Sequence, residues 1–269
     1  MIKTRLIPCI ITKNNLVVQS FGFNKYLPIG DIKTAIEFFV NWDVDEIIII
    51  DIDASRDRRD PNIELVKWAA KECFVPLTVG GGIRSIEHIQ SLLKAGADKV
   101  CLNSYIREYP SFITKASNIY GDQCITISVD ILEKDERYYI FDYQSQDILK
   151  VDVSEYLKKI ENAGAGEILL NSVNRDGSRK GYDINLLKLV SSSVSIPVIA
   201  LGGVGRFEHL GEAIILGGCQ AVAAANIFQH VEHSTIAAKA QMLSRGINVR
   251  LSSEVKYEKF SLDFLGRPF

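Results

Sequence analysis

The chain of 269 residues contains 47% hydrophobic and 24% charged residues, with a formal net charge of −2. Its 31 basic and 33 acidic residues lack the basic excess of a nucleic-acid-binding protein, and the hydrophobic content argues against disorder. The longest apolar stretches fall well short of the roughly 18 residues that a membrane helix needs, and the first residues do not resemble a signal peptide. We therefore expect a cytoplasmic protein without nucleic-acid or membrane partners.

Eight short apolar segments alternate with amphipathic helical patterns along the chain. Several of the strand candidates are apolar on consecutive residues, as is typical of parallel sheets covered by helices. Eight such units predict a single (β/α)8 barrel, the TIM barrel, rather than a doubly wound sheet, which uses fewer strands and a GxGxxG turn that is missing here. The strands are expected at 5–11, 46–52, 76–79, 99–103, 125–130, 167–171, 197–201 and 221–225, with helical patterns at 63–71, 85–95, 154–163 and 207–216.

An internal repeat divides this barrel into two halves. The Gly-Gly pair at 81–82 recurs at 202–203, and the Glu-His pair at 87–88 recurs at 208–209, each shifted by 121 residues. Repeats of this kind indicate the architecture, here two half-barrels of four strands. Without a Pro- or Ser-rich linker, residues 1–253 are expected to form one domain. Residues 254–269 lie past the eighth unit and are expected to be a tail that packs on the barrel or on a partner.

Five cysteines, at 9, 73, 101, 124 and 219, are far apart in the sequence and form no CxxC pair. Without a nearby histidine cluster, this pattern predicts buried free thiols and neither a metal site nor another cofactor.

Small and polar residues at four predicted strand ends indicate phosphate binding. Glycine lets the backbone approach an oxyanion, and barrel enzymes hold phosphate at the carboxyl ends of their strands. Two matching Gly-Gly sites favour a ligand with a phosphate at each end over ordinary strand–helix turns. The segments are 79–82, 103–104, 201–203 and 224–226, and the polar loop 174–182 is placed to close over the ligand.

Two further sets of charged residues occur at opposite ends of the predicted strands. Asp51 and Asp130 end strands, where a carboxylate can transfer protons or can simply bind loop amides. Two bases and two acids begin strands and could form a charged ring across the barrel bottom. Because buried charges are costly unless paired, a structural salt-bridge cluster is the alternative interpretation of the ring. Its members are Arg5, Glu46, Lys99 and Glu167.

Seven short motifs are spread over the predicted barrel: Ile-Pro-Cys at 7–9, Thr-Val-Gly-Gly-Gly-Ile at 78–83, Gly-Ala-Asp-Lys-Val at 96–100, Gly-Ala-Gly-Glu-Ile-Leu-Leu at 164–170, Arg-Asp-Gly at 175–177, Gly-Tyr-Asp at 181–183 and Asn-Val-Arg-Leu at 248–251. Through these motifs the chain resembles, from 3 to 251, the cyclase subunit of imidazole glycerol phosphate synthase.

The resemblance implies roles for particular residues. It implies an ammonia channel through the barrel, gated by the ring of four charges, with Asp98 facing a class I glutaminase partner. It also implies one phosphate site at Gly82, Asn103 and Ser104, and another at Asp176, Gly177, Gly203, Ala225 and Asn226.

The chain departs from the family pattern at the reaction centre. The family uses two aspartates, one ending strand 1 and one ending strand 5, and Asp130 occupies the second place. Ile11 occupies the first and cannot transfer a proton. Gln19 replaces a loop lysine, and Asn171 and Leu201 replace two small hydroxyl residues. The ammonia machinery is thus kept while the cyclisation machinery is altered.

The chain thus resembles a divergent relative of the histidine-pathway enzyme, and such relatives are known in surface-polysaccharide gene clusters. The resemblance implies a lyase- or cyclase-type synthase subunit that passes ammonia to a sugar amidotransferase, which makes an acetamidino group for lipopolysaccharide or another surface polysaccharide. One alternative is an authentic cyclase of histidine biosynthesis in which Asp130, alone or with Asp51, transfers the protons. Another is a non-catalytic ammonia conduit or glutaminase activator.

Overall fold

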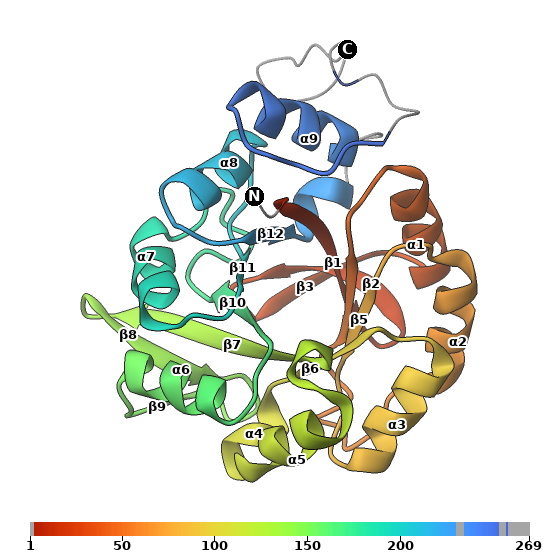
Figure 1. Ribbon diagram of the computed structural model, residues 1–269, viewed down its shortest axis with the longest axis vertical. Coiled ribbons are helices and arrows are strands. Elements are labelled where there is room, and N and C mark those ends of the chain that lie inside the picture. The colour runs from red at the N-terminus through yellow and green to blue at the C-terminus, as the bar shows by residue number, and fades with distance from the viewer. Residues whose placement is uncertain (1–2, 230–233, 253–256, 258–269) are drawn as a thin grey trace.

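Eight parallel strands close into a barrel in the computed structural model, which describes residues 3–229, 234–252 and 257 (Figure 1). The last barrel strand pairs with the first, and the strand that begins at Glu167 pairs with a barrel strand on each side, so the sheet closes on itself. The predicted (β/α)8 barrel is confirmed. The strands, in order around the barrel, are β1 (Arg5–Lys13), β4 (Ile47–Asp51), β5 (Leu77–Gly80), β6 (Lys99–Leu102), β7 (Ile125–Lys134), β10 (Glu167–Ser172), β11 (Val198–Leu201) and β12 (Ala221–Ala224).

Helices surround the barrel strands on the outside (Figure 1). Five of them begin at an Asp, Asn or Ser whose side chain accepts a backbone N–H bond of the first turn, which stabilises that end. The helices are α1 (Ile32–Asn41), α2 (Ile63–Glu72), α3 (Ile86–Ala95), α4 (Ser104–Glu108), α5 (Ser111–Tyr120), α6 (Val153–Asn162), α7 (Ile184–Ser193), α8 (Glu208–Ile215) and α9 (Ser234–Ser244), with short 3-10 turns η1 (Asp122–Cys124) and η2 (Asn226–Gln229).

Alternate residues of each strand face two separate cores, because successive side chains of a strand point to opposite faces. Ile127 and Val129 of β7 pack with the helices in the larger, outer core. Ile7, Cys9 and Leu169 face inward and help to fill the barrel. Each fully buried Ile or Leu contributes about 1.5–3 kcal/mol, so both cores are needed to keep the barrel closed.

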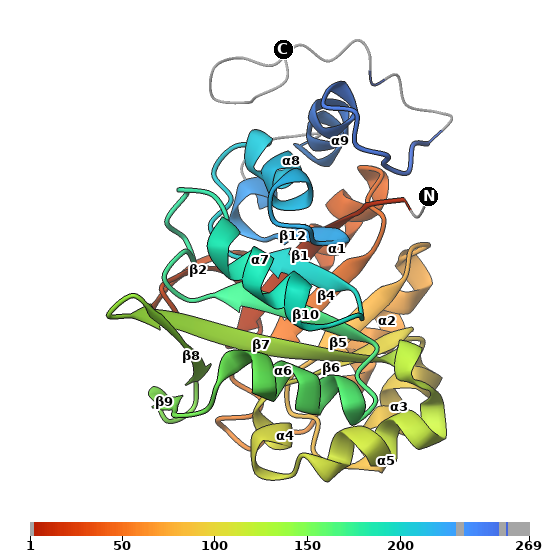
Figure 2. The ribbon, with the colours of Figure 1, turned by 60° about the vertical axis from the view of Figure 1, so that its left-hand side comes forward.

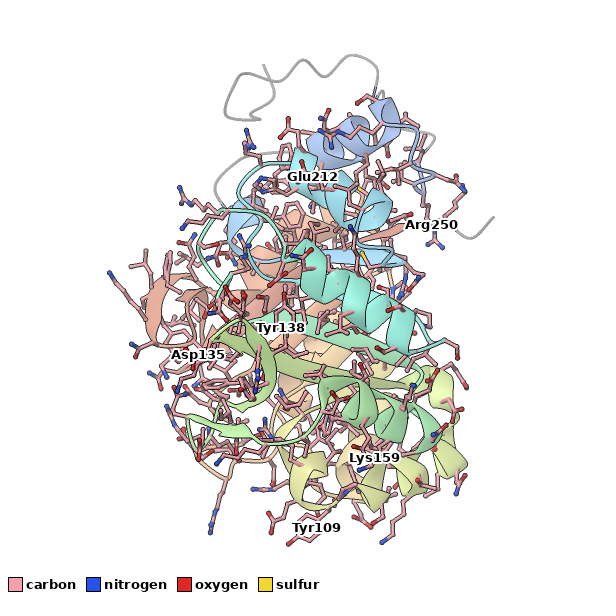
Figure 3. All side chains as sticks on the ribbon, turned by 90° about the vertical axis from the view of Figure 1, so that its left-hand side faces the viewer. Tyr109, Asp135, Tyr138, Lys159, Glu212 and Arg250 are labelled. Carbon is pink, nitrogen blue, oxygen red and sulfur yellow. The ribbon has the colours of Figure 1, made fainter. Side chains whose placement is uncertain are left out.

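Two antiparallel hairpins, which the sequence analysis did not predict, extend the sheet beyond the barrel. Asn14 and Asn15 form the turn of one, and Asp135 and Glu136 form the first turn of the other. All four residues have positive φ, as the two-residue type I′ hairpin turn requires. Both hairpins project on the same side of the barrel in Figure 2, and Asp135 is labelled in Figure 3. Their strands are β2 (Leu16–Phe21), β3 (Lys25–Gly30), β8 (Arg137–Asp142) and β9 (Asp147–Leu149).

The two halves of the barrel share local geometry as well as sequence. The Nδ1 atom of His88 accepts a bond from the N–H of Arg84 at 3.3 Å. The Nδ1 atom of His209 accepts one from the N–H of Gly205 at 3.2 Å. Both residues of the second pair lie 121 positions after those of the first, so the repeat extends to the hydrogen bonds at the start of α3 and α8.

Most of the predicted tail, residues 254–269, lies outside the described residues. Within it, the Tyr257 hydroxyl donates to Asp43, beside the buried ammonium of Lys239. Lys239 Nζ lies 3.2 Å from Asp43 Oδ2 and 3.0 Å from Asp45 Oδ1, so its buried charge is paired. Among the described residues, no helix has the length and apolar character needed to cross a membrane.

Candidate active site

An open cavity of about 880 Å³, its mouth included, lies where the carboxyl ends of the barrel strands meet. A second hollow of about 420 Å³ adjoins it, and Ile11, Asn171 and Leu201 line both. This end of a (β/α)8 barrel is where its enzymes place their active sites. The structure brings all the predicted acids and phosphate-binding residues to these two hollows: Asp51, Asp130, Gly82, Asn103 and Ser104 line the first, and Asp176, Gly177, Gly203, Ala225 and Asn226 line the second.

Asp130 lies on β7 directly before the part of this long strand that pairs with β8, and it lines the first hollow. Its side chain is only 4% exposed, and its Oδ2 accepts a bond of 2.7 Å from Asn103 Nδ2. Burial raises the pKa of Asp130 to about 6, although the Asn103 bond and the charge of Arg107 act in the opposite direction. A carboxyl group with a pKa of about 6 can accept or release a proton near neutral pH, as a general acid or base must.

The raised pKa of Asp130 predicts a pH-dependent stability. Between about pH 4 and 6 the folded protein keeps a proton on Asp130 that the unfolded chain has released. The contribution of Asp130 to the free energy of unfolding therefore falls as pH rises, by about 3 kcal/mol in total. Asp130→Asn cannot ionise, so we expect its unfolding free energy, relative to wild type, to increase from acidic to neutral pH. Urea denaturation at both pH values measures this. If Asp130→Asn and the wild type differ in unfolding free energy by the same amount at acidic and at neutral pH, Asp130 is not a buried ionising group.

Asp51, the second predicted acid, binds its own loop. Its Oδ1 accepts the N–H groups of Asp53 and Ala54, both at 3.1 Å. Its two oxygens also bind the guanidinium of Arg59 at 3.1 and 3.2 Å. This bidentate pair and the two amide bonds shape the turn after β4, which is the structural interpretation that the sequence left open. A catalytic role of Asp51 stays a prediction.

Ile11 lies on β1 directly before the part of the strand that pairs with β2, at the place where the family resemblance puts an acid. It is 9% exposed and packs with Leu201 in the apolar interior of the barrel. Asn171, on the same shared wall, has a buried Oδ1 with no hydrogen-bond partner among the described residues. The wall between the two hollows is therefore mostly aliphatic, with one amide oxygen that has no partner among the described residues.

The first predicted phosphate site lies at the ends of β5 and β6. Gly82 has a φ of +71°, and its N–H donates to Ser55 Oγ at 3.2 Å. A side chain at this position would collide with the backbone of Arg59, 2.5 Å from an added Cβ atom. Glycine is therefore required for the close turn that exposes backbone groups to the cavity.

The second predicted phosphate site is covered by the first hairpin. Asp176 Oδ2 accepts bonds from Ser20 Oγ at 2.6 Å and from the N–H of Phe23 at 3.2 Å. Burial raises the pKa of Asp176. Asn226 Nδ2 donates to the Ser20 carbonyl at 3.1 Å, while its Oδ1 has no described partner. The first hairpin is thus hydrogen-bonded to two residues that line this hollow, Asp176 and Asn226.

Gly203 is expected to be the least replaceable glycine of the second site. Its φ is +101°, and an added Cβ would lie 2.3 Å from the carbonyl oxygen of Gly181. We expect Gly203→Ala to lower the free energy of unfolding by about 1–3 kcal/mol, from backbone strain and this collision. Gly246→Ala is the matched control, because Gly246 has a φ of +75° and no atom within 4 Å. Equal losses in urea denaturation of both variants would show that the contact with Gly181 is unimportant.

Four aromatic residues that the sequence analysis missed line the first hollow: Phe23 and Tyr26 of the first hairpin, Tyr105 of α4, and Tyr143 of the second hairpin. The rings of Phe23 and Tyr143 meet edge-on with centroids 6.2 Å apart, and the Tyr26 hydroxyl donates to the Phe23 carbonyl at 2.9 Å. The Asn-Asn turn at 14–15, between two apolar runs, was the sequence signal that could have revealed the hairpin. Gln19, on β2, is 2% exposed.

The four charges at the amino ends of the strands form one closed ring of ion pairs. Arg5 contacts Glu46 and Glu167, each at 2.7 Å. Lys99 contacts the same two carboxylates at 3.2 and 2.9 Å. The two carboxylates raise the pKa of Arg5 even though burial alone would lower it. Glu46, which is 1% exposed, also accepts a bond of 2.7 Å from Thr78 Oγ1.

Asp98 lies on the same end of the barrel as this ring. It is exposed, and its Oδ2 accepts a bond of 2.8 Å from the N–H of Leu77 at the start of β5. The predicted partner contact at Asp98 would therefore be made beside the ring. In the part of the chain that the structure describes, no group of three or more His, Cys, Asp or Glu side chains is arranged to hold a metal ion.

Fold and site together define a (β/α)8-barrel protein with a cavity at the carboxyl ends of its strands and a ring of ion pairs at the amino ends. Comparison with known proteins gives the family. The family model described as "Histidine biosynthesis protein" matches residues 5–234, and the chain belongs to this family. It is 66% identical over 269 residues to a Vibrio vulnificus (strain YJ016) protein named "Putative imidazole glycerol phosphate synthase subunit hisF2", covering 100% of this chain and 99% of the relative.

Proposed function

We propose that this chain is the ammonia-receiving synthase subunit of a glutamine-dependent complex that serves acetamidino-sugar formation for a surface polysaccharide. The observation that carries the proposal is the contrast between the two ends of the barrel. Arg5, Glu46, Lys99 and Glu167 form a complete ring at one end, while Ile11 stands at the other where the family resemblance places an acid.

The ring suits the passage of ammonia because it is both closed and polar. Its carboxylates exclude bulk solvent while they are paired, and a change in one pair would open a path into the barrel. The partner is a class I glutaminase that docks at the ring end, near Asp98, and releases ammonia there. The complex acts in the cytoplasm.

The cavity at the other end suits an elongated ligand with a phosphate at each end. Its two hollows meet at a shared wall, and each carries glycines with positive φ. Asp130 supplies one proton-transferring group between them. The nitrogen leaves this complex for a separate sugar amidotransferase, because ring closure would need the second acid that Ile11 replaces.

Two experiments test the proposal. First, the purified chain with its glutaminase is assayed with ribulosyl aminoimidazole carboxamide nucleotide, the histidine precursor. We expect turnover to be lower by about 10²–10⁴ than that of an enzyme with both acids. Second, the gene is introduced into a histidine auxotroph that lacks the cyclase subunit, and no growth is expected without histidine. A normal rate, or full complementation, would refute the acetamidino-sugar assignment.

Authentic ring closure in histidine biosynthesis is the second candidate. The pKa of about 6 at Asp130 favours it, since one well-tuned carboxyl group could exchange both protons in turn. The name of the Vibrio vulnificus relative also agrees with it. In this case Asp130→Asn would abolish turnover of the histidine precursor. Calorimetry with a bis-phosphate ligand is the control, because a variant that still binds the ligand has lost the proton transfer and not the binding.

A further inference from the structure

The interior of the barrel has one polar wall. Thr126, Ser128 and Asp130 alternate with Ile127 and Val129 along β7, and the two apolar residues pack outward against the helices. The three polar side chains therefore face the barrel interior. Ser128 and Asp130 line the first hollow at the carboxyl ends of the strands, so the polar wall reaches the candidate active site.

The lower end of this wall lies beside the ring of charges. Thr126 pairs in register with Glu167 of the ring, on β10, and with Cys101 on β6. Two residues closer to the cavity, Ser128 lies beside Leu169, and after two more Asp130 lies beside Asn171. The polar wall thus begins at a ring carboxylate and ends at the proton-transferring acid.

Between the ring and the cavity, the facing wall is apolar. Strands β1, β11 and β12 present aliphatic and thiol side chains to the interior: Ile7, Cys9, Ile11, Ile199, Leu201, Ala221 and Ala223. A small polar molecule that crosses the barrel would therefore find its hydrogen-bonding groups on β7.

The hydroxyl of Thr126 is the unexplained part of this wall. Thr126 is 0% exposed, and its Oγ1 has no hydrogen-bond partner among the described residues. Leaving a buried hydroxyl unpaired is unfavourable, and native proteins seldom do so without a bound molecule or a function. Thr78 differs, because its hydroxyl donates to Glu46 of the ring.

We propose that the Thr126 hydroxyl is a binding station for ammonia directly inside the ring, and that Ser128 is the next hydrogen-bonding group on its way to the cavity. The inference rests on the proposed function, since it assigns the route within the same barrel. Neutral ammonia has one lone pair and three N–H groups, so a hydroxyl, which donates and accepts, matches it in an otherwise apolar space. Thr126 is a positioning residue for the nitrogen and takes no part in bond making.

A titration of the full-length chain tests the station without any acceptor substrate. Methyl-labelled protein is titrated with ¹⁵N-ammonium chloride at alkaline pH, where neutral ammonia is abundant, and sodium chloride is the control. We expect a saturable shift of the Thr126 methyl signal that sodium chloride does not cause. Thr126→Ser keeps the hydroxyl and should bind, whereas the isosteric Thr126→Val should bind about fivefold more weakly or worse, the effect of one neutral hydrogen bond. Because neither variant has the threonine methyl group, the methyl signals of neighbouring Leu169 measure ammonia binding in the variants.

The outcomes separate the station from the proposed function. Equal affinity in Thr126→Val, or no saturable response in the wild type, would overturn the inference. In the complex with glutaminase and amidotransferase, amide-¹⁵N glutamine competes with unlabelled ammonium, and Thr126→Val should lower the share of product nitrogen that comes from glutamine. If the wild-type complex uses added ammonium but no glutamine nitrogen, the proposed function and this inference both fail. If Thr126→Val transfers glutamine nitrogen as the wild type does, only the inference fails.

Discussion

Ile11→Asp is expected to raise ring-closing turnover of the histidine precursor by about 10²-fold or more, because it adds a second proton-transferring group to the cavity that holds Asp130. Ammonium salts supply the nitrogen in this assay, so no glutaminase is needed. The change also removes a well-packed aliphatic side chain and places a polar group among apolar neighbours. We therefore expect the free energy of unfolding to fall by roughly 2–5 kcal/mol.

The matched control is Ile11→Asn, because the asparagine side chain has nearly the same shape as that of aspartate and cannot exchange a proton at neutral pH. It should share the loss of stability and show no gain in turnover. Asp130→Asn added to Ile11→Asp should remove the gain again, because both acids are needed. If Ile11→Asp folds, binds the precursor and still shows no gain, then the residue at 11 does not explain the altered chemistry.

Glu46→Ala is expected to be the most destabilising change in the ring. Glu46 accepts bonds from Arg5, Lys99 and Thr78 and is 1% exposed, so its loss leaves two cations to the single carboxylate of Glu167. Removing one partner of a buried ion pair costs about 3–5 kcal/mol. The lower end of this range applies, because Arg5 and Lys99 are partly exposed and water can reach them.

Urea denaturation of Glu46→Ala and Glu46→Gln separates charge from shape. Glu46→Gln keeps an oxygen for Thr78 and fills the same volume, so it should lose stability through the charge alone and less than Glu46→Ala. Both variants should also let glutamine-derived ammonia escape from the complex under the proposed function. A loss below about 0.5 kcal/mol in Glu46→Ala, which is typical of surface changes, would mean that the ring does not hold the barrel bottom together.

The barrel could be predicted because its strands are buried on both faces and therefore read as continuous apolar runs. The predicted ends were less accurate where a strand leaves the barrel. β1 continues to Lys13 and β7 to Lys134, each because it gains an antiparallel partner beyond the barrel. Exposed segments such as β3, in which only Tyr26 is partly buried, lack an alternation of buried apolar and exposed polar residues, so both hairpins were missed.

The site was predictable to the extent that single residues carry its chemistry. The carboxylate of Asp130 and the aliphatic side chain of Ile11 are facts of the sequence, and the family resemblance located both at strand ends. The pKa of Asp130 was not predictable, because it depends on how completely neighbouring strands bury the carboxyl group. The engagement of Asp51 with Arg59 likewise depends on the path of one loop.

The sequence by itself determined the order of the eight barrel strands, their division into two repeated halves, and the replacement of an acid by Ile11. These depend on local periodicity and on residue type, which need no neighbours. Only the tertiary structure decided which distant residues meet: the four ring charges, the hairpin over Asp176, and Thr126 beside Glu167, with a hydroxyl that has no partner among the described residues. The reason is that closure of the barrel sets the register between strands, and register decides whether a buried polar group finds a partner.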